Sequence, residues 1–320
     1  MDGSVLNGRN GMEAIEEAVR NIKRSNGIIG REQELRKALL CALAGRHLLI
    51  EGPVGVGKTV LATSIANYLG RPIFRVDGDE RYTENKLTGW FDPPLVMQKG
   101  YGRDSFLNGP LASAMEMGGI LFINELNRLN EGVQNVLLPA MDEGRIELPR
   151  LGTLQAGEGF MIIATQNPRE FVATSSLSEA LSDRFELLPL GYQSETEEME
   201  IVRARAPLAD DYTIEKVTLI VRESREHPAI KRGASIRAAT SMASLLARTS
   251  TSFENFREVA YMCLPTRFEL REDSKKSVYE VIDELLERVF AQSTEVESQP
   301  QRVSQEEQDV QGHEKKTISK

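Results

Sequence analysis

The stretch HLLIEGPVGVGKTVLATSIANYL, residues 47–69, sets the organisation of the chain. An apolar run leads into a glycine-rich segment and then into residues with helical spacing. Gly52, Gly57, Lys58 and Thr59 fit the pattern G-x-x-x-x-G-K-[ST]. In this pattern the glycines let backbone N–H groups surround phosphates, the lysine reaches the β- and γ-phosphates, and the hydroxyl binds Mg²⁺. Because a strand and a helix flank it, we predict a phosphate-binding loop and not a chance glycine-rich turn.

Short apolar runs recur along the first 190 residues, separated by segments with helical spacing. They read HLLIE (47–51), PIFRV (72–76), GILFI (119–123), FMIIAT (160–165) and FELLPL (185–190). Continuous apolar strands between helices are typical of a parallel sheet that is covered on both faces. We therefore predict an α/β fold in which a central parallel sheet is flanked by helices.

Beyond this region only helical patterns remain. Ser194 and Glu197 fit a capping box at the start of a helix. Apolar residues at helical spacing follow near the end: Val278, Ile282, Leu285, Leu286 and Val289. The final polar stretch has almost nothing to bury. The predicted divisions are a flexible N-terminus (1–10), an α/β nucleotide-binding core (11–192), an all-helical lid (193–292) and a disordered tail (293–320).

The composition is that of an ordinary globular protein, with 40% hydrophobic and 27% charged residues. The 39 Lys and Arg against 48 Asp and Glu give a net charge of −9, which argues against a general nucleic-acid coat but leaves a local basic groove open. No apolar stretch approaches the roughly 20 residues that span a bilayer, and the N-terminus lacks the layout of a signal peptide. We expect a cytoplasmic protein.

Neither cysteines nor histidines indicate a metal centre. Cys41 and Cys263 lie far apart in apolar helical contexts, which favours buried free thiols over a disulfide or a metal pair. The three histidines have no metal-ligand spacing, so we expect no zinc site.

Polar residues follow two of the predicted strands. The run GGILFINELNR, residues 118–128, turns polar at Asn124 and Glu125, and FMIIATQNP ends with Asn167 before a proline. Ligands of open α/β sheets bind at the carboxyl ends of the strands, so these side chains should face the same crevice as the phosphate-binding loop. Glu125 is then placed to orient an attacking water, and Asn167 to hold it from the other side. Taken alone, Asn167 would fit a turn-capping role better.

These motifs resemble those of MoxR-type AAA+ ATPases of the helix-2-insert clade, over about residues 28–268. GPVGVGKT is similar to Walker A, ILFINE to Walker B, ATQNP to sensor 1, LSEALSDRF to the arginine-finger motif and GASIRAA to sensor 2. Within the family, the sequence looks closest to the CoxD- and CbbQ-like branches, which work beside von Willebrand factor A partners.

The resemblance implies a homo-oligomeric ring, usually a hexamer, with ATP between neighbouring subunits. It implies that Arg184 points into the site of the next subunit, while Arg237 from the lid contacts the γ-phosphate bound by its own chain. A surface salt bridge for Arg184 and a helix-face cation for Arg237 are the alternatives. The expected catalytic residues are Lys58, Glu125, Asn167, Arg184 and Arg237. The expected ATP-binding residues are Ile29, Gly52, Pro53, Val54, Gly55, Val56, Gly57, Lys58, Thr59 and Val60. The expected Mg²⁺-binding residues are Thr59 and Asn124.

Two segments interrupt the pattern of the core. Residues 90–108 are rich in Pro, Gly and aromatics where the family inserts a hairpin into a helix, and a second hairpin is expected over residues 145–157. Trp90 and Tyr101 are candidates for contacts with a central pore or a partner, although packing at the base of the loop is favoured slightly for each. Arg128 fits a contact in trans and a solvated helix charge equally well.

Asn124 stands where most relatives have the Walker B aspartate. An amide still accepts a hydrogen bond but brings no negative charge. Disturbing such an outer-shell partner typically costs about 10- to 100-fold in metal affinity or activity, so a slow but competent ATPase is expected. The rival hypothesis is a nucleotide-gated assembly switch that hardly turns over.

The expected function is a ring that couples ATP hydrolysis to remodelling of a client protein. The family's partners suggest activation of a metalloenzyme through a von Willebrand factor A adaptor, a step that rests on analogy. A nucleic-acid motor is the alternative from another class, and the acidic balance disfavours it.

Overall fold

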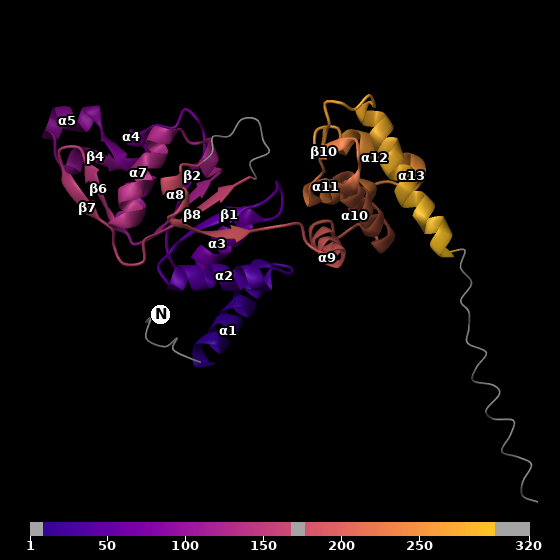
Figure 1. Ribbon diagram of the computed structural model, residues 1–320, viewed down its shortest axis with the longest axis horizontal. Helices are drawn as coiled ribbons and strands as arrows, with labels where there is room; N and C mark the ends of the chain where they lie inside the picture. Colours follow the sequence, from indigo (N-terminus) through magenta and orange to yellow (C-terminus); the bar gives the residue numbers. More distant parts are fainter. Residues whose placement is uncertain (1–8, 168–176, 298–320) are drawn as a thin grey trace, which may run out of the picture. The chain divides into compact units, whose positions relative to one another are not determined.

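The computed structural model describes residues 9–167 and 177–297, and the chain divides into two compact units between Ile201 and Val202 (Figure 1). The first unit contains the α/β pattern. Its helices are α1 (Arg9–Asn26), α2 (Glu32–Leu43), α3 (Lys58–Tyr68), α4 (Glu84–Thr88), α5 (Pro93–Lys99), α6 (Pro110–Glu116), α7 (Glu131–Asp142) and α8 (Glu179–Ser182). Helix α9 (Glu195–Arg205) crosses the boundary.

Five parallel strands form the central sheet of this unit. They are β1 (His47–Glu51), β2 (Ile73–Asp77), β5 (Ile120–Asn124), β8 (Met161–Gln166) and β9 (Phe185–Pro189), in the spatial order β2-β5-β8-β1-β9. The predicted α/β fold is confirmed, and each strand overlaps one of the five apolar runs. Because β8 lies between β1 and β5, the carboxyl ends of these three strands are neighbours.

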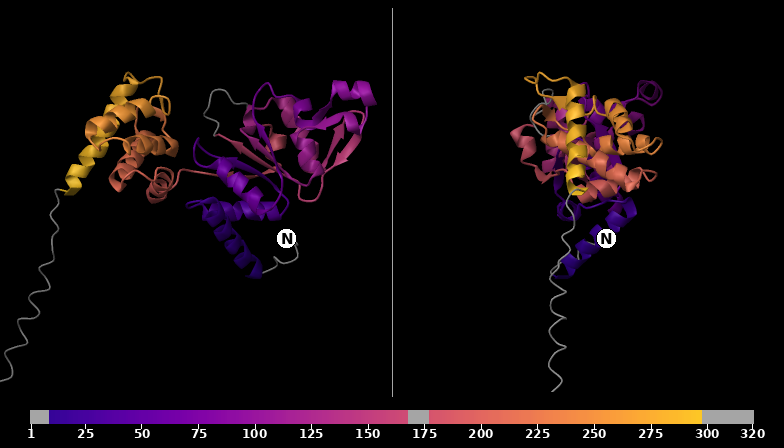
Figure 2. Two further views of the ribbon diagram at one scale, coloured as in Figure 1. Left: turned by 180° about the vertical axis from the view of Figure 1, so that it is seen from behind. Right: turned by 90° about the vertical axis from the view of Figure 1, so that its right-hand side faces the viewer.

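The two faces of the sheet are buried in two separate hydrophobic clusters. Leu48, Ile50 and Phe122 belong to the cluster covered by α1, α2 and α3, whereas Leu49 and Leu121 belong to the one covered by α4, α6 and α7 (Figures 1 and 2). Successive side chains of a strand point to opposite faces, so a strand covered on both sides must be apolar throughout. Each fully buried aliphatic or phenyl side chain contributes about 1.5–3 kcal/mol.

The insertion at residues 90–108 contains the expected hairpin pairing, with helical segments between its two strands that were not predicted. Strands β3 (Gly89–Phe91) and β4 (Phe106–Asn108) pair antiparallel, but α5 and the short helix η1 (Arg103–Ser105) lie between them. Asp92 caps α5 by accepting from the Leu95 amide at 3.0 Å, and prolines open the helix. The second hairpin is confirmed, with β6 (Arg145–Leu148) paired to β7 (Gly152–Gln155).

The two aromatic residues of the insertion differ in their surroundings. The Tyr101 ring contacts Phe91 edge-on at 5.1 Å, and the Arg150 guanidinium lies 3.9 Å from its centroid. Tyr101 therefore joins the insertion to the β6–β7 hairpin. Trp90 remains 45% exposed, so its ring is open to further contacts.

The second unit is built from α10 (Asp211–Glu226), α11 (Ile236–Leu246), α12 (Phe253–Cys263) and α13 (Val278–Glu297). The apolar residues at helical spacing in α13 are buried, apart from the partly buried Val278. A two-stranded antiparallel sheet of β10 (Ile230–Arg232) and β11 (Glu269–Leu270) was missed, because two or three residues carry no periodicity. Helix α13 also runs past residue 292, the expected end of the lid.

The capping box ahead of α9 is confirmed. The Ser194 amide donates to Glu197 Oε2 at 2.9 Å, and the Glu197 amide donates to Ser194 Oγ at 3.4 Å. The expected flexible N-terminus and disordered tail fall mostly on residues 1–8 and 298–320, which lie outside the described residues. The domain boundaries of the sequence analysis stay a prediction.

Within the described ranges, none of the helices is both long enough and apolar enough to cross a membrane. Both cysteines are buried and free, as expected. The Cys41 thiol donates to the Arg46 carbonyl at 3.3 Å, and burial raises its pKa to about 11.

The raised pKa predicts that Cys41 resists alkylation in the folded protein. With a pKa of about 11, roughly one Cys41 thiol in a thousand is ionised at pH 8, and the thiolate is the nucleophile. We expect iodoacetamide at pH 8 to label the Cys41 peptide far more slowly in native protein than in urea, as followed by mass spectrometry. Equal labelling rates in the two conditions would contradict this.

Candidate nucleotide site

The phosphate-binding loop joins the carboxyl end of β1 to the first turn of α3. Gly55 and Gly57 adopt φ of 86° and 95°, a region that strongly favours glycine. At Gly52, a Cβ atom would lie 2.1 Å from the Leu190 carbonyl oxygen, so only glycine fits. The loop therefore delivers the chain to the start of α3, where unpaired backbone N–H groups suit an anion.

Lys58 spans this loop and reaches the neighbouring strand. Its ammonium donates to the carbonyls of Gly52 at 2.5 Å and Pro53 at 2.8 Å, and to Asn167 Oδ1 at 2.9 Å. Asn167 directly follows β8, which pairs with β1. The structure thus brings two of the expected catalytic residues into contact.

Glu125 continues this line of hydrogen bonds. Its carboxylate accepts from Asn167 Nδ2 at 3.4 Å and from Arg128 Nη1 at 2.7 Å. The Glu125 backbone has φ 58° and ψ 56°, which is uncommon for a residue with a side chain and costs on the order of 1 kcal/mol. Its amide donates to Thr165 Oγ1 at 3.0 Å, which helps to hold this conformation. Arg128 therefore contacts Glu125 within the chain, and its expected contact in trans stays untested.

The Asn124 amide has a partner on each side. Its Nδ2 donates to Asp77 Oδ1 at 3.0 Å, and its Oδ1 accepts from Thr165 Oγ1 at 3.1 Å. Asp77 is the last residue of β2 and lies opposite Asn124 in the register of the sheet. Hydrogen bonds from Arg75, and to a lesser extent from Asn124, lower the pKa of the Asp77 carboxyl, so it is ionised at neutral pH. A carboxylate is thus present at the end of β2, one strand away from the end of β5, where the Walker B aspartate usually stands.

The oxygen atoms near this edge suit Mg²⁺, which commonly uses one or two protein ligands together with phosphates and water. Thr59 offers its hydroxyl from the first turn of α3, and Asn124 offers its carbonyl oxygen at the end of β5. Across the part of the chain that the structure describes, no group of three or more His, Cys, Asp and Glu could hold a metal ion.

The segment that contains Ile29 lies against the loop through Arg31. The Arg31 guanidinium donates to the carbonyls of Val56 at 3.2 Å and Gly191 at 2.6 Å. The Ile29 carbonyl accepts from Gln193 Nε2 at 2.7 Å. Arg31 has a φ of 66° and a side chain that is only 9% exposed, so it is held firmly between the loop and the segment after β9.

Arg184 lies at the amino ends of the parallel strands, whereas Lys58 lies beyond their carboxyl ends. Arg184 immediately precedes β9, whose first residue pairs with His47 at the amino end of β1. A strand of five residues is about 17 Å long, so Arg184 cannot reach the loop of its own chain. Its Nε and Nη2 donate to the two Asp142 oxygens at 2.6 Å and 2.5 Å, and this contact lowers the pKa of the Asp142 carboxyl.

Arg237 belongs to the second unit, in the first turn of α11, and its side chain is exposed. Among residues 9–167 and 177–297, its guanidinium has no hydrogen bond or ion pair. The proposed roles of Arg184 and Arg237 stay predictions.

Comparison with known proteins supports the assignment of a nucleotide site. Residues 47–185 match the family model of the AAA domain, dynein-related subfamily. The gas vesicle ATPase GvpN1 of Halobacterium salinarum is 31% identical over 198 residues, which are 57% of this chain and 57% of that protein. The uncharacterized protein YeaC of Bacillus subtilis is 28% identical over 81% of this chain and 88% of its own length. The match thus spans little more than half of the gas vesicle ATPase.

One solved structure of similar fold is a RuvB variant from Thermotoga maritima, with a TM-score of 0.50 and 21% identity over 73% of this chain and 71% of that chain. The matches place an AAA domain at residues 47–185, in agreement with the resemblance to MoxR-type AAA+ ATPases, and such domains use ATP and Mg²⁺. The narrower placement beside the CoxD- and CbbQ-like branches is not tested by these relatives and stays a prediction.

Sequence reasoning missed three residues of this site. Thr165 ends the apolar run FMIIAT, Asp77 follows the apolar run PIFRV by one position, and Arg31 lies outside every motif. The first two could have been found from the rule that polar residues near carboxyl strand ends face the ligand. Arg31 carried no local signal.

The buried Thr165 hydroxyl predicts a measurable cost when it is removed. Thr165→Val keeps the shape but leaves the Glu125 amide and the Asn124 carbonyl without this partner, which should lower the free energy of unfolding by about 1–3 kcal/mol. Thr165→Ser keeps the hydroxyl and serves as the matched control in urea unfolding. If Thr165→Val has a higher free energy of unfolding than Thr165→Ser, the two hydrogen bonds stabilise the fold less than the burial of methyl groups does.

Proposed function

We propose that the chain hydrolyses ATP in a homo-oligomeric ring, which the family resemblance implies to be a hexamer, and uses the cycle to remodel a client protein. One observation carries this proposal. Lys58, Asn167 and Glu125 form a hydrogen-bonded series at the carboxyl ends of the strands, whereas Arg184 lies at the amino ends. Because Arg184 cannot reach the other three residues within one chain, a second copy must supply the arginine to each site.

The roles of the side chains follow from their positions. Lys58 exchanges its bonds to loop carbonyls for the β- and γ-phosphates, because its ammonium is a mobile point charge with three donors. Asn167 is then free to hold the attacking water, and Glu125 accepts a proton from it. Thr59 and Asn124 would hold Mg²⁺, which would neutralise phosphate charge.

Arg184 of one protomer supplies positive charge to the γ-phosphate held by the next. A guanidinium has five N–H bonds. Asp142 engages two of them and the Ala180 carbonyl one, which leaves one on each terminal nitrogen for a phosphate oxygen. Such an arginine in trans is worth about 10³–10⁵ in rate, so turnover should depend on assembly.

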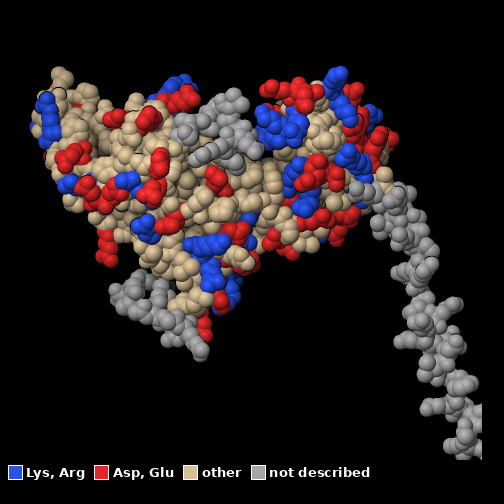
Figure 3. All heavy atoms as spheres, viewed as in Figure 1, with Lys and Arg blue, Asp and Glu red and all other residues tan. Residues whose placement is uncertain are grey.

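The remodelling of a client metalloenzyme through a von Willebrand factor A adaptor, in the cytoplasm, extends the proposal by family analogy. A nucleic-acid motor is less well supported. On the visible face, acidic and basic side chains are interspersed over both units (Figure 3). A backbone-binding surface would instead gather basic residues in a stripe. The nucleotide-gated switch stays the stronger rival, because both ends of the Asn124 amide are engaged.

The Asn124–Asp77 contact sharpens the test of turnover. Asn124→Asp alone would place two carboxylates about one hydrogen-bond length apart, so we expect little gain from it. The double variant Asn124→Asp with Asp77→Asn exchanges the two groups and should lower the Mg²⁺ requirement by about 10- to 100-fold. Glu125→Gln should abolish turnover. Phosphate release over a Mg²⁺ titration measures all three, and absence of Mg²⁺-dependent turnover in assembled wild-type protein would leave the switch.

Mixing two inactive variants tests the division of the site. Glu125→Gln disables the protomer's own site, whereas Arg184→Ala disables that of its neighbour. Each variant alone should lose about 10³-fold or more in turnover. In a mixture, an Arg184→Ala protomer beside a Glu125→Gln protomer has a complete site, so phosphate release should partly return. A mixture as inactive as its components, despite co-assembly shown by light scattering, would refute action in trans.

A further inference from the structure

His47 is a partly buried histidine at the amino end of β1, and the roles assigned to the site do not use it. Its Nδ1 accepts from the Ile162 amide of β8 at 3.0 Å. Both residues lie one position before Leu48 and Ile163, the first register pair between β1 and β8. Because Nδ1 is the acceptor, the neutral ring carries its proton on Nε2 and can donate from there.

His47 also contacts the end of α7, next to the carboxylate that holds Arg184. Burial lowers the pKa of the His47 imidazole, and a hydrogen bond with the Met141 backbone acts in the opposite direction. A hydrogen bond raises the pKa of a histidine when the ring donates, so the Met141 carbonyl is the acceptor. Met141 directly precedes Asp142, the last residue of α7, whose carboxylate binds Arg184 through both oxygens.

The same ring contacts the residue that follows Arg184. Phe185 is the first residue of β9 and the register partner of His47. The His47 and Phe185 rings lie edge to face, with centroids 6.4 Å apart. Phe160, just before β8, makes a second edge-on contact at 6.1 Å. These neighbours restrict rotation of the imidazole, so the direction of its Nε2 is fixed.

The residue before His47 makes a different kind of contact with β9. Arg46 Nε donates to Glu186 Oε1 at 3.0 Å, and both side chains are more than half exposed. Water and salt screen such a pair, so it contributes little to the position of a strand. His47, by contrast, reaches β8, β9 and α7 from a partly buried position.

We propose that His47 is a positioning residue for Arg184: its ring joins the end of α7 and the start of β9 to β1, and so holds the Asp142–Arg184 pair in the orientation that serves the neighbouring subunit. This inference rests on the proposed function, in which Arg184 acts in trans. His47 lies a strand length away from the phosphate-binding loop of its own chain and acts through Asp142 and Phe185. A displacement of about 1 Å can cost about 10²-fold in rate.

His47→Asn tests this role. The amide oxygen of asparagine can still accept from the Ile162 amide, but the shorter side chain cannot reach Met141 and lacks the ring. Phosphate release by the assembled full chain should fall about 10- to 100-fold. His47→Gln is long enough to bring an N–H to the Met141 carbonyl and should recover part of this loss. Arg46→Gln is the matched control and should turn over like the wild type.

Mixing variants separates a misplaced Arg184 from a damaged nucleotide site. In a mixture with Glu125→Gln, an intact Arg184 from one protomer reaches the intact site of a His47→Asn protomer, so turnover should partly return. In a mixture with Arg184→Ala, no protomer supplies a well-placed arginine, and turnover should stay low. A His47→Asn protomer that was merely destabilised would recover turnover in neither mixture.

Three results would overturn the inference: wild-type turnover in His47→Asn, no recovery with Glu125→Gln, or recovery with Arg184→Ala. The mixture of Glu125→Gln with Arg184→Ala reports on the proposed function separately. If that mixture recovers and the His47→Asn mixtures do not behave as expected, only the inference fails. If that mixture stays inactive despite co-assembly, action in trans fails and the inference fails with it. Thermal unfolding of each variant checks that the fold is intact.

Discussion

The hydrogen bonds of the Lys58 ammonium hold together the edge of the sheet on which the site depends. Lys58 contacts the carbonyls of its own loop and the Asn167 side chain, and Asn167 contacts Glu125. These residues follow three different strands, β1, β8 and β5. They meet because β8 lies between β1 and β5, so that the three carboxyl ends are adjacent. A parallel sheet with this strand order is therefore the constraint from which the geometry of the site follows.

The same sheet separates groups that must not meet within one chain. Arg184 precedes β9 and Glu125 follows β5, so they lie at opposite edges. Asp142 binds the Arg184 guanidinium through two oxygens and fixes its direction without using all of its donors. At the carboxyl edge, Asp77 contacts Asn124 and places a negative charge one strand away from the usual position. The charged side chains of the site thus belong to different strands or to the segments beside them.

Much of the core could be predicted because its signals are local. The apolar runs, the strand and helix that flank the glycine-rich loop, and the capping box each depend on residues within one short segment, and all were confirmed. The insertion at residues 90–108 contains the expected antiparallel pair, but Asp92 and the two prolines after it start a helix between its strands that was not predicted. The β10–β11 pair was missed because each strand gains its partner from a distant segment.

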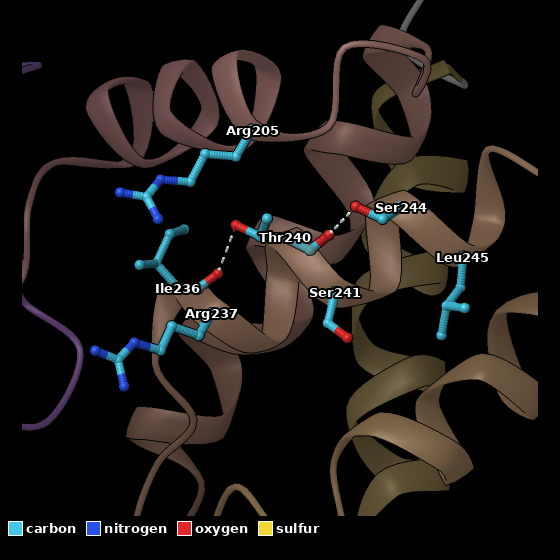
Figure 4. Close-up of a pocket in the computed structure, with 7 residues that line it drawn as sticks. All are labelled: Arg205, Ile236, Arg237, Thr240, Ser241, Ser244 and Leu245. Carbon is cyan, nitrogen blue, oxygen red and sulfur yellow. Dashed lines mark hydrogen bonds between the residues drawn. The ribbon is translucent and has the colours of Figure 1, made fainter. Parts of the chain in front are cut away.

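The sequence by itself determined the strand–loop–helix unit, the five apolar strands and the chemistry available at their ends. Spacing decides these features, since backbone geometry repeats over a few residues. Only the tertiary structure decided that Asp77 contacts Asn124, that Arg31 bridges Val56 and Gly191, and that Arg205 of α9 shares a surface hollow with Arg237 of α11 (Figure 4). Each of these contacts joins separate segments through side chains, and their meeting depends on strand order and helix packing, which no short stretch of sequence specifies.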